Sequence, residues 1–353
     1  MQRKRLYNIL TVALVLALVA ALLAYASLGA SNYVQRIILL LGINIILVVS
    51  LNLSNGFTGV FSLGHIGFMA IGAYASAILT LPVAMKRVNL PDLPAWLAGI
   101  ELHFLVATLL AGTLALVIAF VVGLSLMRLT GPYVSVATMG FLVIVQVVLV
   151  NWDALTRGAR TFAGVPPYSN LWWVWGWTVL TVYVIWRLVR SSFGRWMMAV
   201  RDNEIAAQSL GISVMKSRLF AFCISAFFTA VAGSLWAHFI MSFSPKSFYF
   251  VQTFSVITML AVGGMGSVSG SIVGTVSITV LSEVLRNAER GIDLGFVALP
   301  PVYGASQILM AVLFVLVIVF KPKGLLGDKE IDFNRLWSRL LGGRSAADTT
   351  DQR

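Results

Sequence analysis

The chain has 353 residues, of which 59% are hydrophobic and 11% charged, and its formal net charge is +12. Soluble domains carry about 25% charged residues, so this chain has too few to cover a globular surface, and lipid must be its solvent. The basic residues fall mainly at the ends of apolar segments, where anionic lipid accounts for them without any nucleic acid. The single cysteine, Cys223, excludes an intrachain disulfide and a cysteine-based metal cluster, and we expect no metal site.

A succession of apolar segments predicts an all-α, polytopic membrane protein. The segments lie near 6–28, 34–53, 66–81, 103–127, 132–150, 171–189, 218–240, 251–265, 269–285 and 304–320. A span needs about 20 residues, and the two segments within 251–285 are shorter than that. Counting these two separately, with the N-terminus inside, leaves Lys321 and Lys323 inside, where basic residues accumulate. We therefore predict about ten transmembrane segments, some of them short or broken, with both termini cytoplasmic.

The two ends of the chain differ in polarity. The apolar run at 6–28 is longer than the core of a signal peptide, which has about 7–15 residues, so we interpret it as an uncleaved first span. Residues 327–353 are polar and end in a stretch typical of disordered segments. We therefore predict a transmembrane domain at 1–326 and a cytoplasmic tail at 327–353.

Two glycine-rich stretches, at 55–73 and 262–274, interrupt the apolar segments in the two halves of the chain. Irregular backbone at membrane depth survives only where protein buries it or where it lines a wet cavity. A pair of such stretches is typical of the substrate site in transporters built from inverted repeats, which we expect here. The candidate pathway residues are Ser62, Gly64, His65, Gly67, Gly263, Gly264 and Gly266.

Close packing explains the same glycines equally well. Gly266, Gly270 and Gly274 follow one another at the four-residue spacing that small residues show in helix–helix contacts. His65 fits either a hydrogen bond inside a bundle or a place on a pathway, because ionisable groups within membranes are often functional. The sequence leaves open whether these stretches line a path or only pack.

The longest charged interruption of the apolar segments is the basic loop at 191–217, which belongs on the cytoplasmic side. Within it, residues 203–210 predict a short helix that Asp202 or Asn203 can cap and that Gly211 can end with a positive φ. A helix held clear of the bilayer is a docking element for a cytosolic partner, although a solvated connector explains its charge too. Ala206, Ala207 and Leu210 would make a small, smooth face on it.

The sequence contains no G-x-x-x-x-G-K-[ST] phosphate-binding loop, so we expect no directly bound cofactor, and any ATP must bind another subunit. Two rival functions fit the sequence less well. A stand-alone secondary transporter or channel would need ionisable residues deep in several spans, and these are scarce. An intramembrane serine hydrolase would pair Ser267 or Ser269 with His65 or His238, but no acidic third member is evident.

Several blocks of sequence carry a resemblance that covers most of the chain. In the basic loop, EIAAQSLG at 204–211 matches an E-x-A-A-x-x-x-G pattern. The other blocks are SLGHIGFMAIGAY at 62–74, LTGPYVSVATMGF at 129–141, LAVGGMGSVSGSIVG at 260–274 and FKPKGLLG at 320–327. Together they resemble the permeases of branched-chain amino acid ABC importers, in particular the second, LivM-type permease subunit.

The resemblance implies a permease subunit of the bacterial inner membrane, without chemistry of its own. It implies assembly with a second related permease and two cytosolic ABC ATPase subunits, and delivery of branched-chain or other hydrophobic amino acids by a periplasmic substrate-binding protein. On the motif, the residues that couple this chain to an ATPase are Glu204, Ala206, Ala207 and Gly211. The family's T-G-G-x-x-G run is replaced by TRGARTFAG at 156–164, so urea, short amides and aromatic amino acids stay alternative substrates.

Overall fold

The computed structural model describes residues 20, 23, 24, 29, 31–289, 304–321 and 324–327. The chain divides into a unit at 38–328 and a second unit formed by residues 1–37 and 329–353. Most of the predicted first span at 6–28 and nearly all of the predicted tail at 327–353 lie outside the described residues. The predicted domain boundary after residue 326 therefore stays a prediction.

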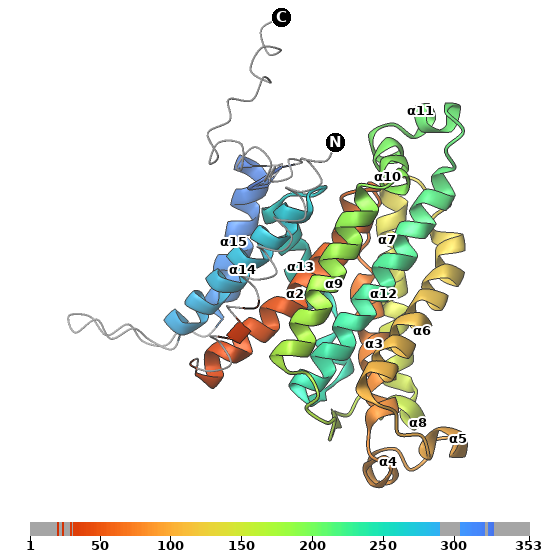
Figure 1. The fold of residues 1–353 in the computed structure, drawn as a ribbon, viewed down its shortest axis with the longest axis vertical. Helices are drawn as coiled ribbons and strands as arrows, with labels where there is room; N and C mark the ends of the chain where they lie inside the picture. Colours follow the sequence, from red (N-terminus) through yellow and green to blue (C-terminus); the bar gives the residue numbers. More distant parts are fainter. Residues whose placement is uncertain are drawn as a thin grey trace, which may run out of the picture. The chain divides into compact units, whose positions relative to one another are not determined.

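Helices dominate the described residues (Figure 1). The longer ones are α2 (Asn32–Asn55), α3 (His65–Thr80), α6 (Phe104–Leu126), α7 (Pro132–Asn151), α9 (Leu171–Val189), α12 (Val214–Ile240), α13 (Phe250–Gly263), α14 (Val268–Glu289) and α15 (Ala305–Phe320). Every predicted apolar segment after the first coincides with one of these helices. Five of them, α2, α6, α7, α12 and α14, are long and apolar enough to cross a membrane. The all-α membrane class is confirmed, whereas the total of about ten spans and the inverted repeats stay predictions.

Short elements connect the long helices. At one end of the 38–328 unit lie α4 (Val83–Asn89), α5 (Ala95–Ala98) and α8 (Asp153–Thr156), and at the other lie α10 (Ser192–Asp202) and α11 (Glu204–Ser209) (Figure 1). A 3₁₀ turn, η1 (Pro245–Ser247), precedes α13. Strands β1 (Phe162–Ala163) and β2 (Ser242–Phe243) form an antiparallel pair. This pair ties the loop after α8 to the end of α12.

The centre of the unit is the packing of α12 against α3 and α6 (Figure 1). Glycines let α3 and α12 approach closely. A Cβ at Gly72 of α3 would lie 2.1 Å from the carbonyl oxygen of Ala230 in α12, so no larger residue fits there. A Cβ at Gly233 of α12 would lie 2.0 Å from the carbonyl oxygen of Met69. Lipid is as apolar as the side chains, so helices in membranes associate through this kind of close backbone contact.

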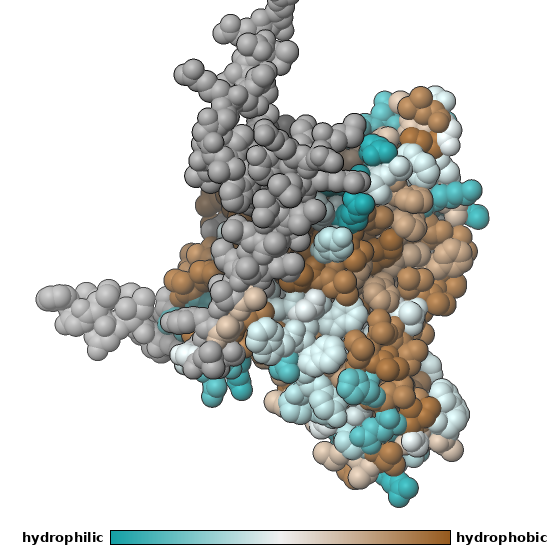
Figure 2. Space-filling model, viewed as in Figure 1, coloured by the Kyte–Doolittle hydropathy of each residue, from teal (hydrophilic) through white to brown (hydrophobic). Residues whose placement is uncertain are grey.

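Hydroxyl groups add bonds between the central helices. The hydroxyls of Thr108 in α6 and Ser234 in α12 lie 2.8 Å apart, and those of Ser50 in α2 and Thr229 in α12 lie 3.1 Å apart. The outer flank of α6 is apolar instead, as the brown surface in Figure 2 shows. Its exposed apolar side chains include Val106, Leu109, Leu110, Leu114, Val117, Phe120 and Val121. Such a face suits lipid or another membrane helix rather than water.

Candidate functional site

The predicted polar helix is present as α11, with the termini that the sequence indicates. The side-chain oxygen of Asn203 accepts a hydrogen bond from the backbone N–H of Ala206 at 3.0 Å, which caps the start of the helix. Gly211 has φ +79°, and the N–H of Ile212 donates to the carbonyl of Ala207 at 3.0 Å. This six-to-one bond, with a left-handed glycine before it, is the Schellman ending. The helix and both caps are therefore confirmed.

The residues of the predicted small face of α11 differ in their exposure. Ala207 is only 2% exposed and lies against the protein. Ile205 and Leu210 are each 78% exposed, and Ala206 is exposed between them. Because Ile205 precedes Ala206 directly and Leu210 follows one turn later, the outward surface is more apolar than the motif alone suggests.

Glu204 binds α11 to α12 through an ion pair with Arg218. The side chain of Arg218 is 6% exposed and that of Glu204 is 37% exposed. A buried guanidinium is costly unless a carboxylate compensates it. Glu204 therefore compensates a charge inside the protein, in addition to standing first in the motif, and it fixes α11 relative to the beginning of a long membrane helix.

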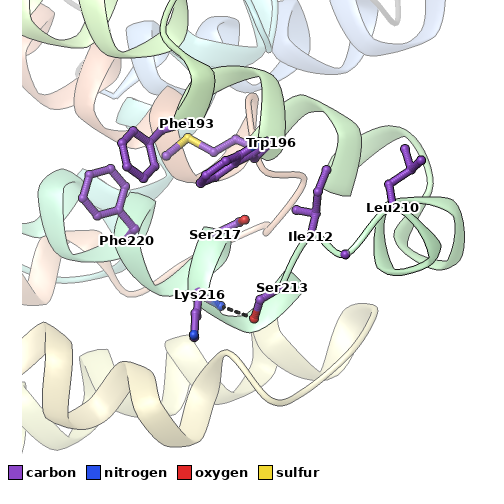
Figure 3. A pocket seen from close by; sticks show the side chains of 10 residues that line it. Phe193, Trp196, Leu210, Ile212, Ser213, Lys216, Ser217 and Phe220 are labelled. Atoms are coloured by element: carbon purple, nitrogen blue, oxygen red, sulfur yellow. Dashed lines mark hydrogen bonds between the residues drawn. The ribbon is translucent and has the colours of Figure 1, made fainter.

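An apolar groove of about 460 Å³ runs beside α11, between α10 and the first turns of α12 (Figure 3). In Figure 3, Phe193 and Phe220 face each other at one end of the groove, and Leu210 stands at the other. The rings of Phe193 and Phe220 stack with centroids 5.2 Å apart. Phe193 and Trp196 are 48% and 44% exposed. The groove thus continues the apolar outer surface of α11.

Arg201, in the last turn of α10, connects this loop to the first glycine-rich stretch. Its Nη1 donates to the carbonyl oxygen of Gly56 at 3.1 Å, and its Nε donates to the carboxylate of Asp202 at 3.0 Å. Gly59 has φ +72°, and a Cβ there would lie 3.1 Å from Cγ of Arg201. The side chain of Arg201 therefore lies across the glycine-rich backbone that follows α2.

Asn52, near the end of α2, joins the two glycine-rich stretches. Its Oδ1 accepts from the N–H of Gly266 at 2.9 Å. Its Nδ2 donates to the carbonyl of Ser267 at 2.9 Å and to the hydroxyl of Ser271 at 2.8 Å. A Cβ at Gly56 would lie 2.3 Å from the nitrogen of Gly266, so the two stretches are also in direct backbone contact. Sequence reasoning missed Asn52, although an amide within an apolar helix was a signal.

The second glycine-rich stretch forms the turn between α13 and α14. Gly264 and Gly266 there have φ +117° and +90°, conformations that side chains other than glycine rarely adopt. Gly263 packs against Gly270, since a Cβ at Gly263 would lie 2.2 Å from the carbonyl oxygen of Gly270. The N–H of Leu325 donates to the carbonyl of Val262 at 2.8 Å, so Leu325 packs against the end of α13 beside this turn.

The candidate residues of the first stretch lie in a different environment. Gly64 packs on the backbone of Thr138, and Gly67 packs on the ring of Phe141, both in α7. Ser62 and His65 are buried, and they border a cavity of about 10 Å³ beside α13 that has room for about one water molecule. The glycines at 64 and 67 thus have packing roles, whereas Ser62 and His65 border an internal space.

His65 is held by hydrogen bonds at both ring nitrogens. Nδ1 lies 2.9 Å from the hydroxyl of Ser62, and Nε2 lies 2.6 Å from the hydroxyl of Ser225. The Ser225 hydroxyl donates its proton to the carbonyl of Ser50, so it must accept from Nε2–H. In a neutral ring Nδ1 then accepts from Ser62. His65 therefore ties α3 to α2 and α12.

The rival catalytic arrangement is not formed among the described residues. The ring of His65 bonds to Ser62 and Ser225, while His238 bonds to Thr80 at 2.7 Å and to the carbonyl of Ser234 at 2.8 Å. Neither imidazole therefore faces Ser267 or Ser269 as a general base must. Within the parts of the chain that the structure describes, no group of three metal-binding side chains occurs.

Comparison with known proteins gives a match along most of the chain. The family described as "Branched-chain amino acid transport system / permease component" matches residues 33–319. The chain is 30% identical over 318 residues to the high-affinity branched-chain amino acid transport system permease protein LivM of Escherichia coli, covering 80% of this chain and 68% of that protein. No solved structure is significantly similar to this chain.

Two further relatives are more distant or shorter in their match. The probable branched-chain amino acid transport permease protein LivM of Methanocaldococcus jannaschii is 25% identical over 332 residues, which cover 85% of this chain and 95% of that protein. The autoinducer 2 import system permease protein LsrC of Klebsiella pneumoniae is 32% identical over 174 residues, which cover 42% of this chain and 47% of that protein.

Proposed function

The chain belongs to the branched-chain amino acid transport permease family, and we propose that it is one permease subunit of an ABC importer. It would pair with a second, related permease and receive branched-chain or other hydrophobic amino acids from a periplasmic substrate-binding protein. ATP would be bound and hydrolysed by two cytosolic ATPase subunits. The observation that carries this proposal is the family match over 33–319, which includes the predicted coupling motif at 204–211.

The geometry of α11 supports its role as the contact with an ATPase. The helix is short, capped at both ends and anchored to α12 by the Glu204–Arg218 pair. Its outward side chains Ile205 and Leu210 are each 78% exposed, which is unusual for large apolar groups beside a basic loop. Exposed apolar side chains on a rigid support suit a groove on a partner protein. Of the motif residues, Ala206 would contact the partner, while Glu204 and Ala207 would hold the helix in place.

Charge supports a proposal for the orientation. Arg187, Arg190 and Arg195 stand close to α11 in the sequence, at one end of the helices. Basic residues accumulate on the cytoplasmic side of membrane proteins. We therefore propose that α10 and α11 lie in the cytoplasm and α4, α5 and α8 on the opposite side, and the family match supports the proposal that the membrane is the bacterial inner membrane.

The amino-acid pathway is proposed near the contact of the two glycine-rich stretches. Helix α2 ends there, α13 gives way to α14, and the buried polar groups of Ser62 and His65 border a small cavity. Helix ends within a membrane leave backbone N–H and C=O groups that can meet a polar substrate.

The coupling proposal is tested with Glu204→Lys and Gly211→Val. The first replaces the partner of a buried arginine with a like charge, and the second forces a β-branched residue into φ +79°. Both variants should insert normally but lose uptake of leucine, isoleucine and valine by membrane vesicles, and both should lose co-purification with the ATPase. Gly140→Val is the control, because a Cβ there would meet nothing within 4 Å. Wild-type uptake in both variants would remove the coupling role of α11.

A further inference from the structure

We propose that Arg201 is a positioning residue that transmits movement of α11 to both glycine-rich stretches, with Asn52 as the second element of the same link. The proposal rests on the proposed coupling function of α11. The link consists of three contacts, from α11 to Arg201, from Arg201 to Gly56, and from Gly56 and Asn52 to Gly266.

The first contact is covalent and short. Asn203 is at once the last-turn partner of α10, where its N–H donates to the carbonyl of Ala199 at 3.0 Å, and the N-cap of α11. A single residue therefore joins the two helices, and hydrogen bonds hold it on both sides. Because Arg201 is two positions before Asn203, α11 cannot shift without moving the last turn of α10 that carries this arginine.

The second contact is a charge-assisted hydrogen bond from Arg201 to the backbone. The guanidinium uses two different nitrogens, Nε toward Asp202 and Nη1 toward the carbonyl of Gly56. Asp202 orients the planar group, and bonds from a charged donor are stronger than neutral ones. The lack of a side chain at Gly59 lets Arg201 approach the same backbone, so Arg201 touches the stretch at two points.

The third contact passes from the first glycine-rich stretch to the second. The N–H of Gly56 donates to the carbonyl of Asn52 at 2.8 Å, and the backbones of Gly56 and Gly266 are in contact. The amide of Asn52 is fully buried and, among the described residues, bonds only to the turn between α13 and α14 and to the first turn of α14. A displacement of Gly56 therefore acts on the turn in two ways, directly through the backbone of Gly266 and indirectly through Asn52.

The position of the link at two helix breaks gives it a mechanical role. Glycine-rich backbone changes its dihedral angles at little steric cost, so it bends more readily than the helices around it. A polar link between rigid helices would concentrate movement at these breaks. A merely stabilising contact would instead change assembly and uptake together, and would leave the transport achieved per ATP unchanged.

The test uses the whole importer, assembled with its second permease, ATPases and binding protein in proteoliposomes. Arg201→Ala removes the donor, and Arg201→Lys keeps the charge with a single-point donor that cannot serve both partners. Arg195→Ala is the matched control, because Arg195 lies on the same helix and its Nη2 bonds to Ser192 of that helix at 2.9 Å. Uptake, ATP hydrolysis stimulated by loaded binding protein, and co-purification of the ATPase are measured for each.

We expect Arg201→Ala to keep ATPase binding and ATP hydrolysis while amino acid moved per ATP falls about tenfold, the loss expected from one charge-assisted bond. Arg201→Lys should recover part of this ratio, and Arg195→Ala should match the wild type. In a double-mutant cycle, adding Asn52→Leu to Arg201→Ala should lower the amino acid moved per ATP only slightly further, because both residues belong to one link.

The outcomes separate the two proposals. An unchanged ratio of transport to ATP in Arg201→Ala, or effects of Arg201→Ala and Asn52→Leu that simply add, would overturn the link and leave the coupling role of α11 untouched. Loss of both assembly and uptake in Arg201→Ala, without partial rescue by Arg201→Lys, would assign a structural role instead. If the wild-type chain bound no ATPase at all, the proposed function itself would fail.

Discussion

Replacing Asn52 with leucine removes three hydrogen bonds from the contact between α2 and the α13–α14 turn. The groups that lose a partner are the N–H of Gly266, the carbonyl of Ser267 and the hydroxyl of Ser271. They are not affected equally, because the hydroxyl of Ser271 also donates to the carbonyl of Ser267 at 3.1 Å. The Ser267 carbonyl and the Ser271 hydroxyl therefore keep each other as partners, whereas the N–H of Gly266 loses its acceptor.

The size of the effect follows from this difference. Hydrogen bonds between membrane helices contribute about 0.6 kcal/mol each on average, which gives about 1 kcal/mol for the two bonds to Ser267 and Ser271. Leaving one buried N–H unsatisfied costs about 1–3 kcal/mol. We therefore expect Asn52→Leu to lower the free energy of unfolding by about 2–4 kcal/mol, since leucine fills a similar volume and leaves no large cavity.

The single cysteine makes the measurement direct. Cys223 is buried in α12, so a thiol-reactive fluorophore labels it only when the bundle opens. Thermal unfolding in detergent should shift several degrees downward for Asn52→Leu. Asn151→Ala is the control, because that exposed amide bonds within its own helix, to the carbonyl of Val147 at 2.8 Å. Equal melting temperatures for Asn52→Leu and the wild type would refute this account of the α2 junction.

Two further predictions concern the helix core and the outer loop. Gly72→Leu should destabilise the α3–α12 contact by about 1–3 kcal/mol or prevent folding, because a Cβ would lie 2.1 Å from the carbonyl oxygen of Ala230, whereas Gly140→Leu should melt like the wild type. Burial lowers the pKa of Lys86, partly opposed by the charge of Glu101. The unfolded chain keeps this proton up to about pH 10.5, so the free energy of unfolding should rise with pH just below that value. Lys86→Met should abolish this slope in melting curves taken across alkaline pH, and an unchanged slope would contradict it.

Much of the local structure could be predicted because its causes are local. The cap at Asn203 and the left-handed Gly211 act on the few residues beside them, so the pattern at 203–211 was enough to predict α11 and its ends. The apolar segments could be located for a similar reason, since each must satisfy its own backbone hydrogen bonds in lipid and therefore forms a helix. The total number of spans depends on more than composition, and it stays a prediction.

The candidate site shows where local reasoning stops. Gly64 and Gly266 look alike in the sequence, but Gly64 packs on α7, whereas the N–H of Gly266 donates to the side chain of Asn52 in α2. Ala207 stands in the coupling motif beside Ala206, yet only the latter faces outward. In the sequence, nothing distinguishes Arg201 from the other basic residues of its loop, whereas in the fold it donates to the carbonyl of Gly56.

By itself, the sequence determined that this chain is a helical membrane protein, which family it resembles, and where helix α11 begins and ends. Only the tertiary structure decided that the two glycine-rich stretches touch, and that Asn52 and Arg201 join them to that helix. The physical reason is range: capping and hydrophobicity act within a few residues, whereas the bond from Asn52 to Gly266 spans 214 positions and exists only once the helices have packed.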